Sequence, residues 1–157
     1  MDELSKKYLN KMAAMCSRRE YCEHDIREKL RIAELPQNDI ESIIDYLKKF
    51  SFINDERYAT AYVKDKFQFN GWGKAKIVAM LSMKRIERTI IENAVQQLPV
   101  DSYKEKCLTL LQSKAKSTKA QNISELKNKL LRYAIGRGFD YETSLQCISE
   151  ITLQANP

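Results

Sequence analysis

Residues 26–47, IREKLRIAELPQNDIESIIDYL, decide the fold, because their apolar positions recur twice further along the chain. Within this stretch the positions are Ile26, Leu30, Leu35, Ile43, Ile44 and Leu47. A shift of 51 residues gives Ile77, Leu81, Ile86, Ala94, Val95 and Leu98, and a shift of 104 gives Leu130, Ala134, Phe139, Cys147, Ile148 and Ile151. Every position is apolar or small. Self-similarity at a spacing of about 50 residues is the signature of a repeat protein.

The spacing inside each copy predicts helices. Ile40, Ile43, Ile44 and Leu47 form one stripe of a helix, and Pro36 interrupts the chain just before them. Only four Gly and three Pro occur in 157 residues, too few turn residues for a sandwich or barrel of strands. The pattern predicts helices at residues 3–21, 23–33, 38–49, 54–69, 73–84, 87–97, 101–115, 123–136 and 141–153.

We therefore expect an all-α protein made of three tandem three-helix repeats, each a helix-turn-helix-like unit, stacked into an elongated, curved array. The predicted repeats are residues 1–53, 54–99 and 100–157. Capping boxes at helix starts are predicted for Asn38 with Glu41, Ser102 with Glu105, and Asn122 with Glu125. Residues 114–122 are interpreted as an exposed loop that carries three lysines.

Cell location and cysteine use follow from composition. No run of about 18 apolar residues could span a membrane, and the first residues lack the features of a signal peptide. We expect a cytoplasmic monomer that does not bind membranes. No C-x-x-C pair occurs among the four cysteines, which we interpret as small core residues: Cys16, Cys22, Cys107 and Cys147.

Catalytic and metal-binding patterns are missing from the sequence. The single histidine, His24, lies two residues from Cys22, and residues at that spacing do not share a helix face. Residues 71–74, GWGK, lack the spacing of a phosphate-binding loop. The adjacent acids Asp55 and Glu56 fit the first turn of a helix better than a catalytic pair. The sequence predicts no catalytic residue, metal or cofactor.

Charge favours an anionic partner. The net charge of +6 is zero over residues 1–50 and +3 over each of residues 51–98 and 99–157. Basic residues beside Trp72, Phe67 and Phe69 could hold a phosphate backbone and stack a base; the alternative is a solvated helix face with aromatics in the core. The candidate contacts to such a partner are Arg18, Arg19, Lys64, Lys66, Trp72, Lys74, Lys76, Lys84, Arg85, Arg88, Lys127, Lys129, Arg132 and Arg137.

Four stretches resemble the RecX family. Residues 16–30, CSRREYCEHDIREKL, resemble its first repeat, and residues 52–64, FINDERYATAYVK, resemble its most recognisable block. Residues 73–77, GKAKI, and 137–140, RGFD, are similar to later family motifs. The chain departs from the family at residues 84–86, KRI, where a Gly-Ile turn is usual, and at Cys22, where a Ser cap is common.

The resemblance implies a bacterial regulator of the RecA recombinase that acts in homologous recombination, DNA repair and the SOS response. It implies binding to RecA or to the RecA–DNA filament, with modulation, chiefly inhibition, of the ATPase, strand-exchange and co-protease activities. It brings no catalytic residue. Two alternatives stay open: a sequence-neutral DNA-binding protein that competes for DNA, and a helical scaffold for another protein. The scaffold alternative expects no effect when Lys84, Arg85 and Arg88 are reversed to Glu.

Overall fold

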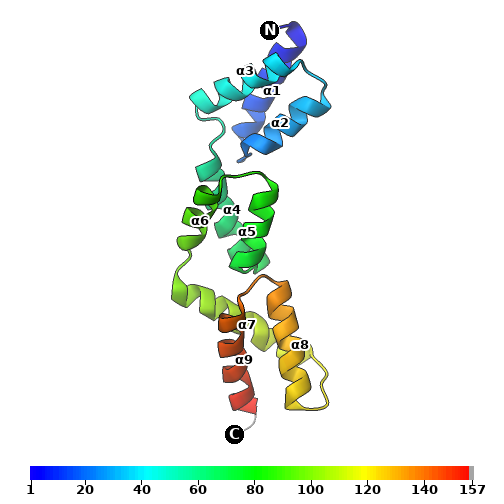
Figure 1. Ribbon diagram of the computed structural model, residues 1–157, viewed down its shortest axis with the longest axis vertical. Helices are drawn as coiled ribbons and strands as arrows, with labels where there is room; N and C mark the ends of the chain where they lie inside the picture. Colours follow the sequence, from blue (N-terminus) through cyan, green and yellow to red (C-terminus); the bar gives the residue numbers. More distant parts are fainter. Residues whose placement is uncertain (156–157) are drawn as a thin grey trace. The chain divides into compact units, whose positions relative to one another are not determined.

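The computed structural model describes residues 1–155, and within them the chain forms nine helices and no strand (Figure 1). This confirms the all-α prediction. The helices are α1 (Glu3–Cys16), α2 (Glu23–Ile32), α3 (Gln37–Lys49), α4 (Asp55–Asn70), α5 (Lys74–Met83), α6 (Arg88–Gln96), α7 (Val100–Ser117), α8 (Ile123–Gly136) and α9 (Tyr141–Ala155). None of these helices combines the length and the apolar character that crossing a bilayer requires.

The recurring apolar positions are the core positions. Seventeen of the eighteen are buried, and the remaining one, Leu98, is partly buried against the core of the last three helices. Burying a Leu or Ile side chain stabilises a fold by about 1.5–3 kcal/mol. The repeat in the sequence is therefore a repeat in packing.

The turn before the third helix of each repeat has the same conformation. Glu34, Arg85 and Gly138 have φ of 61°, 55° and 98°, and they are related by the same shifts of 51 and 104 residues. Each left-handed residue ends a helix, as expected for the residue just past a helix C-terminus. In the first and third turns the next amide returns to the helix, Leu35 N–H to Leu30 O at 3.4 Å and Phe139 N–H to Ala134 O at 3.0 Å.

Close contacts divide the chain into two compact units. Unit 1 comprises residues 1–62 and 81–91, and unit 2 comprises residues 63–80 and 92–157. The core of unit 1 lies among α1, α2 and α3, where Met12, Ile26 and Leu47 are buried. The core of unit 2 lies among α7, α8 and α9, where Tyr103, Leu111 and Phe139 are buried. The repeat boundaries at residues 53/54 and 99/100 stay a prediction.

Helix ends differ from expectation where proline or a turn intervenes. Helix α1 ends at Cys16 and not at residue 21, because residues 17–19 form a turn. Helices α3 and α7 begin directly after Pro36 and Pro99, so the capping boxes predicted at Asn38 and Ser102 are wrong. Each proline occupies the N-cap position itself, with an extended ψ of 142° or 136°, so the helix starts ahead of the polar candidate.

Local signals succeed in the third repeat. The Asn122 side chain accepts the Glu125 N–H at 2.8 Å, which confirms the predicted cap of α8. The predicted loop at residues 114–122 is shorter than expected, because α7 continues to Ser117. Of the cysteines, Cys22, Cys107 and Cys147 are buried free thiols and Cys16 is partly buried, in agreement with their interpretation as core residues.

Candidate functional site

The basic surplus of the chain lies in unit 2. That unit holds thirteen Lys and Arg residues against eight Asp and Glu, a net charge of +5. Unit 1 holds fourteen against thirteen, a net charge of +1. An anionic ligand is therefore attracted mainly to unit 2.

Two turns of unit 2 touch backbone to backbone. The Gly73 N–H donates to Arg137 O at 2.7 Å, and the Ala75 N–H donates to Gly138 O at 3.0 Å. A Cβ on Gly73 would lie 2.3 Å from the Gly138 carbonyl carbon, so only glycine permits this approach. The contact fixes the turn that carries Trp72 at the start of α5.

Two lysines lie beside the Trp72 ring. The Lys66 Nζ, from α4, is 5.0 Å from the indole centroid, and the Lys76 Nζ, from α5, is 4.6 Å from it. An ammonium group at such a distance is attracted to the ring by about 0.5–1 kcal/mol at an exposed site. The structure thus brings together three of the residues predicted from the sequence.

Helix α7 adds residues that the sequence analysis missed. The Lys74 Nζ is 4.6 Å from the Tyr103 ring, and the Lys74 N–H donates to the Tyr103 hydroxyl at 3.0 Å. Burial raises the pKa of Tyr103 to about 12, so the phenol is neutral at physiological pH. The Lys106 Nζ is 5.6 Å from the Phe67 ring, which stacks on Tyr103 with centroids 5.9 Å apart.

These residues form one basic–aromatic cluster, which we define as Lys66, Phe67, Trp72, Lys74, Lys76, Tyr103 and Lys106. It presents four ammonium groups, and the partly exposed Trp72 ring lies beside two of them, whereas Tyr103 and Phe67 belong to or pack against the core. Lysines beside an accessible ring can bind a phosphate backbone and stack a base. Tyr103 and Lys106 follow Trp72 by about 30 residues. Their only signal in the sequence was the basic, tyrosine-bearing start of α7.

Arg137 has a structural role. Its Nη2 donates to the carbonyl of Asn70, the last residue of α4. A cation at this position also balances the negative end of the helix dipole. The Arg137 Nε is buried without a hydrogen-bond partner. Arg137 therefore holds the end of α4 and the turn at Gly73 in place, and it is a poor candidate for direct contact.

The remaining candidates of unit 2 lie apart from the cluster as defined. Lys129, on α8, is held by Glu125 at 3.0 Å and by the Lys119 carbonyl at 2.6 Å. The others are exposed: Lys64, Lys127 and Arg132. They can add long-range attraction to an anion, but the structure gives them no shared geometry.

Five candidates lie in unit 1. The Arg19 guanidinium is 4.7 Å from the Tyr21 ring, and the Lys84 Nζ pairs with the Asp25 carboxylate at 2.6 Å. The other three are exposed: Arg18, Arg85 and Arg88. Because Lys84 has this partner within its own unit, its reversal to Glu would disturb unit 1 as well as any ligand contact.

The block at residues 54–57 fastens helices of unit 1. Asn54 caps α4 by accepting the Arg57 N–H at 2.9 Å. Asp55 opens α4, as expected of a first-turn acid, but its Oδ1 also accepts the Glu23 N–H at 2.9 Å and so caps α2. Arg57 reaches back to the Glu20 carboxylate. Asn54, Asp55 and Arg57 of this block thus each make a contact that holds helices of unit 1 together.

The thiols are poorly suited to nucleophilic chemistry. Burial raises the pKa of Cys22 to about 12, and it also raises the pKa of Cys107. A thiol in this condition stays protonated at neutral pH and is inert. Within residues 1–155, no group of three or more His, Cys, Asp or Glu residues could hold a metal ion.

Sequence profiles identify the helical units. The second three-helix domain of RecX matches residues 54–95, and the third three-helix domain of RecX matches residues 101–148. Together they cover more than half of the chain. The chain belongs to the RecX family.

Relatives and solved structures agree with this RecX assignment. A Clostridium beijerinckii "Regulatory protein RecX" is 30% identical over 131 residues, 82% of this chain and 61% of that protein. A Clostridioides difficile namesake is 29% identical over 150 residues, 96% of this chain and 70% of that protein. The crystal structure of RecX from Lactobacillus salivarius matches with a TM-score of 0.85 and 26% identity, covering 95% of this chain and 97% of that one.

The basic–aromatic cluster of this RecX chain draws on both matched domains. Lys66, Trp72 and Lys76 lie in the second three-helix domain, and Tyr103 and Lys106 lie in the third. The aligned segment spans 61% of the C. beijerinckii protein, so the chain is shorter than that relative.

Proposed function

We propose that this chain regulates the RecA recombinase by binding RecA or the RecA–DNA filament, and that it chiefly inhibits the ATPase, strand-exchange and co-protease activities. The observation that carries the proposal is the pair of consecutive RecX three-helix domains at residues 54–95 and 101–148. Relatives of this chain bear the name "Regulatory protein RecX". RecA as the target follows from the resemblance of residues 52–64 to the family's most recognisable block.

The basic–aromatic cluster supplies the contact in this proposal. Its four lysines face an anionic surface, either filament DNA or an acidic patch on RecA, and Trp72 adds an aromatic surface beside two of them. The Gly73–Gly138 contact holds the Trp72 turn in place before binding, which lowers the entropy lost on association. Contacts along a polymer add through effective concentration, so no single contact needs to be strong.

The test is the ATPase of RecA on single-stranded DNA at increasing concentrations of this protein. We expect the rate to fall. The variant Lys66→Glu/Lys76→Glu should need at least about tenfold more protein, because each reversal replaces attraction by repulsion. The control Lys6→Glu/Lys7→Glu changes the net charge equally at exposed positions of α1 and should match the parent protein.

No change of the ATPase at a several-fold excess over filament sites would reject RecA regulation. Equal weakening by the control pair would show that net charge acts without the cluster.

Competition for DNA is the second candidate, favoured by the +5 charge of unit 2. It predicts tight binding to bare DNA and a steep loss of affinity with salt. The two candidates separate when single-stranded DNA is added in excess over RecA. Relief of inhibition in proportion to added DNA supports competition, whereas inhibition that tracks the ratio of this protein to RecA supports filament binding.

A further inference from the structure

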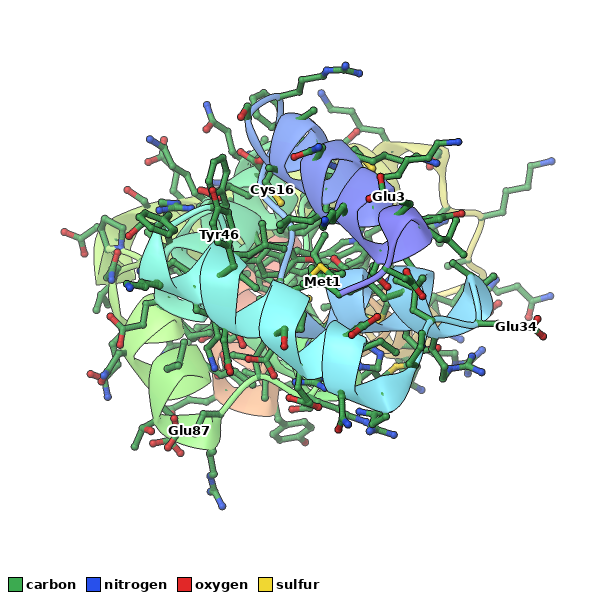
Figure 2. The ribbon with its side chains drawn as sticks, turned by 90° about the horizontal axis from the view of Figure 1, so that it is seen from above. Met1, Glu3, Cys16, Glu34, Tyr46 and Glu87 are labelled. Atoms are coloured by element: carbon green, nitrogen blue, oxygen red, sulfur yellow. The ribbon has the colours of Figure 1, made fainter. Side chains whose placement is uncertain are left out.

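The first three helices have an open groove on their surface, between α1 and α2. In unit 2, α7, α8 and α9 all pack on one another. In unit 1, α1 and α2 both pack on α3 but approach each other less closely. Figure 2 looks onto this end of the chain, with Glu3 and Cys16 marking the two ends of α1 and Glu34 following α2. An open groove of about 510 Å³ lies between α1 and α2.

The floor of the groove is apolar. Met12 is 2% exposed and belongs to the core of unit 1, and Met15 packs against that core beside it. Ile32 lies on the wall with 71% of its surface exposed. Unbranched methionine side chains adapt to the shape of an incoming apolar group. Covering this apolar surface with a ligand would therefore be energetically favourable.

The charged groups lining the groove are all positive. Lys11 from α1 and Lys29 from α2 line it, and no carboxylate does. Each ammonium group lies over a ring, Lys11 at 5.5 Å from the Tyr8 centroid and Lys29 at 5.7 Å from the Tyr21 centroid. A ligand that fills this groove should carry negative charge on both sides of an apolar stripe.

We propose that the α1–α2 groove docks an amphipathic helix of a partner protein, with an apolar stripe against Met12, Met15 and Ile32 and acidic residues facing Lys11 and Lys29. A helix fits because its anchors recur at the spacing that the groove residues of α1 themselves follow. One aromatic ring, Tyr8, lines the groove and already lies beside the Lys11 ammonium, whereas the other apolar lining residues are aliphatic, which favours an apolar helix face over stacked bases. The site lies wholly in unit 1 and is independent of the basic–aromatic cluster.

The probe is a fluorescent designed peptide of about five helical turns, with leucine at every third or fourth position and glutamate on the flanks. Anisotropy is measured without RecA or DNA, so the result does not depend on the proposed function. We expect saturable binding, weakened about tenfold or more by Ile32→Asp, since a charge replaces a buried apolar contact. Lys11→Glu/Lys29→Glu should weaken this peptide and strengthen a version with lysine flanks.

Two controls guard the interpretation. Leu153→Asp changes a side chain as exposed as Ile32, 72% against 71%, and should leave binding unchanged. Lys66→Glu/Lys76→Glu should also leave it unchanged, which excludes general attraction to the basic unit. Equal binding of the acidic and basic peptides, or full binding to Ile32→Asp, would overturn the proposal. An oligonucleotide that displaces the peptide and itself depends on Ile32 would make the groove a nucleic-acid contact.

Discussion

Glu34, Arg85 and Gly138 occupy one place in three equivalent turns, and their side chains suit it unequally. All three have positive φ, the left-handed region that costs a residue with a Cβ about 1–2 kcal/mol. Glycine has no such cost. At Gly138 a Cβ would also lie 2.5 Å from the Lys76 Cβ. The third turn therefore requires glycine, whereas the first two tolerate strain.

Arg85→Gly should stabilise the protein. Its φ of 55° suits glycine, and the exposed Arg85 side chain has little packing to lose. We expect the free energy of unfolding to rise by about 0.5–1 kcal/mol, the relief of strain less the extra entropy of glycine in the unfolded chain. Denaturant titration measures it. Arg85→Ala removes the same side chain but keeps the strain, so an equal gain with alanine would contradict this account.

Gly73→Ala should destabilise unit 2. The added Cβ would lie 2.4 Å from the Gly138 carbonyl oxygen, well inside van der Waals contact, so the backbone must move. We expect a loss of about 2–3 kcal/mol, typical of overpacking at a rigid contact, with a change in the fluorescence of the single tryptophan.

Gly136→Ala is the matched control for Gly73→Ala. A Cβ at Gly136 would meet nothing within 4 Å, and the residue ends α8. Alanine there should be neutral or should stabilise by up to about 1 kcal/mol. A similar loss in both variants would show that the Gly73–Gly138 approach is not what requires glycine.

Acid should weaken unit 1 through Asp25. Burial alone would raise the pKa of Asp25, but hydrogen bonds from Lys84 and Cys22 lower it below the usual value. A lowered pKa in the folded state adds stability above the unfolded pKa of about 3.9, and that stability is lost as pH falls through the folded value. Asp25→Asn should therefore lower stability at pH 7 and flatten its fall below about pH 5. The control substitution Asp45→Asn, at an exposed position of α3, should change neither the stability at pH 7 nor its fall in acid.

At the scale of the helices, sequence patterns predicted correctly those features that depend on residues close together in the chain. The period of apolar residues placed the helices, and Asn122 capped α8 as its own sequence indicated. The cap of α2 was hidden, because its acceptor on Asp55 is 32 residues from Glu23. The hydrogen bond from the Arg137 side chain to the Asn70 carbonyl joins residues 67 positions apart. Such partners are chosen by packing and leave no pattern in either segment alone.

The cap that crosses from α4 to α2 can be tested by two substitutions. Asp55→Ala removes the acceptor of the Glu23 N–H, and we expect the free energy of unfolding to fall by about 1 kcal/mol, as for other helix caps. Asp55→Asn keeps an acceptor oxygen. Burial raises the pKa of Asp55, which means that its charge is held at a cost, so asparagine should be nearly neutral. Hydrogen exchange of the α2 amides should rise only in the alanine variant, and a rise in both would refute the cap.

At the scale of the whole molecule, the sequence located the basic surplus but not its geometry. Lys66, Trp72 and Lys76 were predicted as contacts and lie together. Charge counts alone ranked Arg137 and Lys84 equally with these residues as contact candidates. In the structure, however, Arg137 binds the Asn70 carbonyl and Lys84 pairs with Asp25. Tertiary packing adds Lys106 to the cluster by bringing it beside Phe67 of α4, a proximity that neither helix encodes.

The salt dependence of DNA binding should separate the cluster from the diffuse charge of the chain. Each phosphate neutralised on single-stranded DNA contributes about 0.7 to the slope of log affinity against log salt. If Lys66 and Lys76 each neutralise one phosphate, Lys66→Gln/Lys76→Gln should lower the magnitude of that slope by about 1.4. Lys6→Gln/Lys7→Gln removes the same charge from α1 and should leave the slope within about 0.3 of the parent value. Equal slopes for both pairs would mean that anions are drawn by net charge, and the grouping of lysines around Trp72 would then have no part in binding DNA.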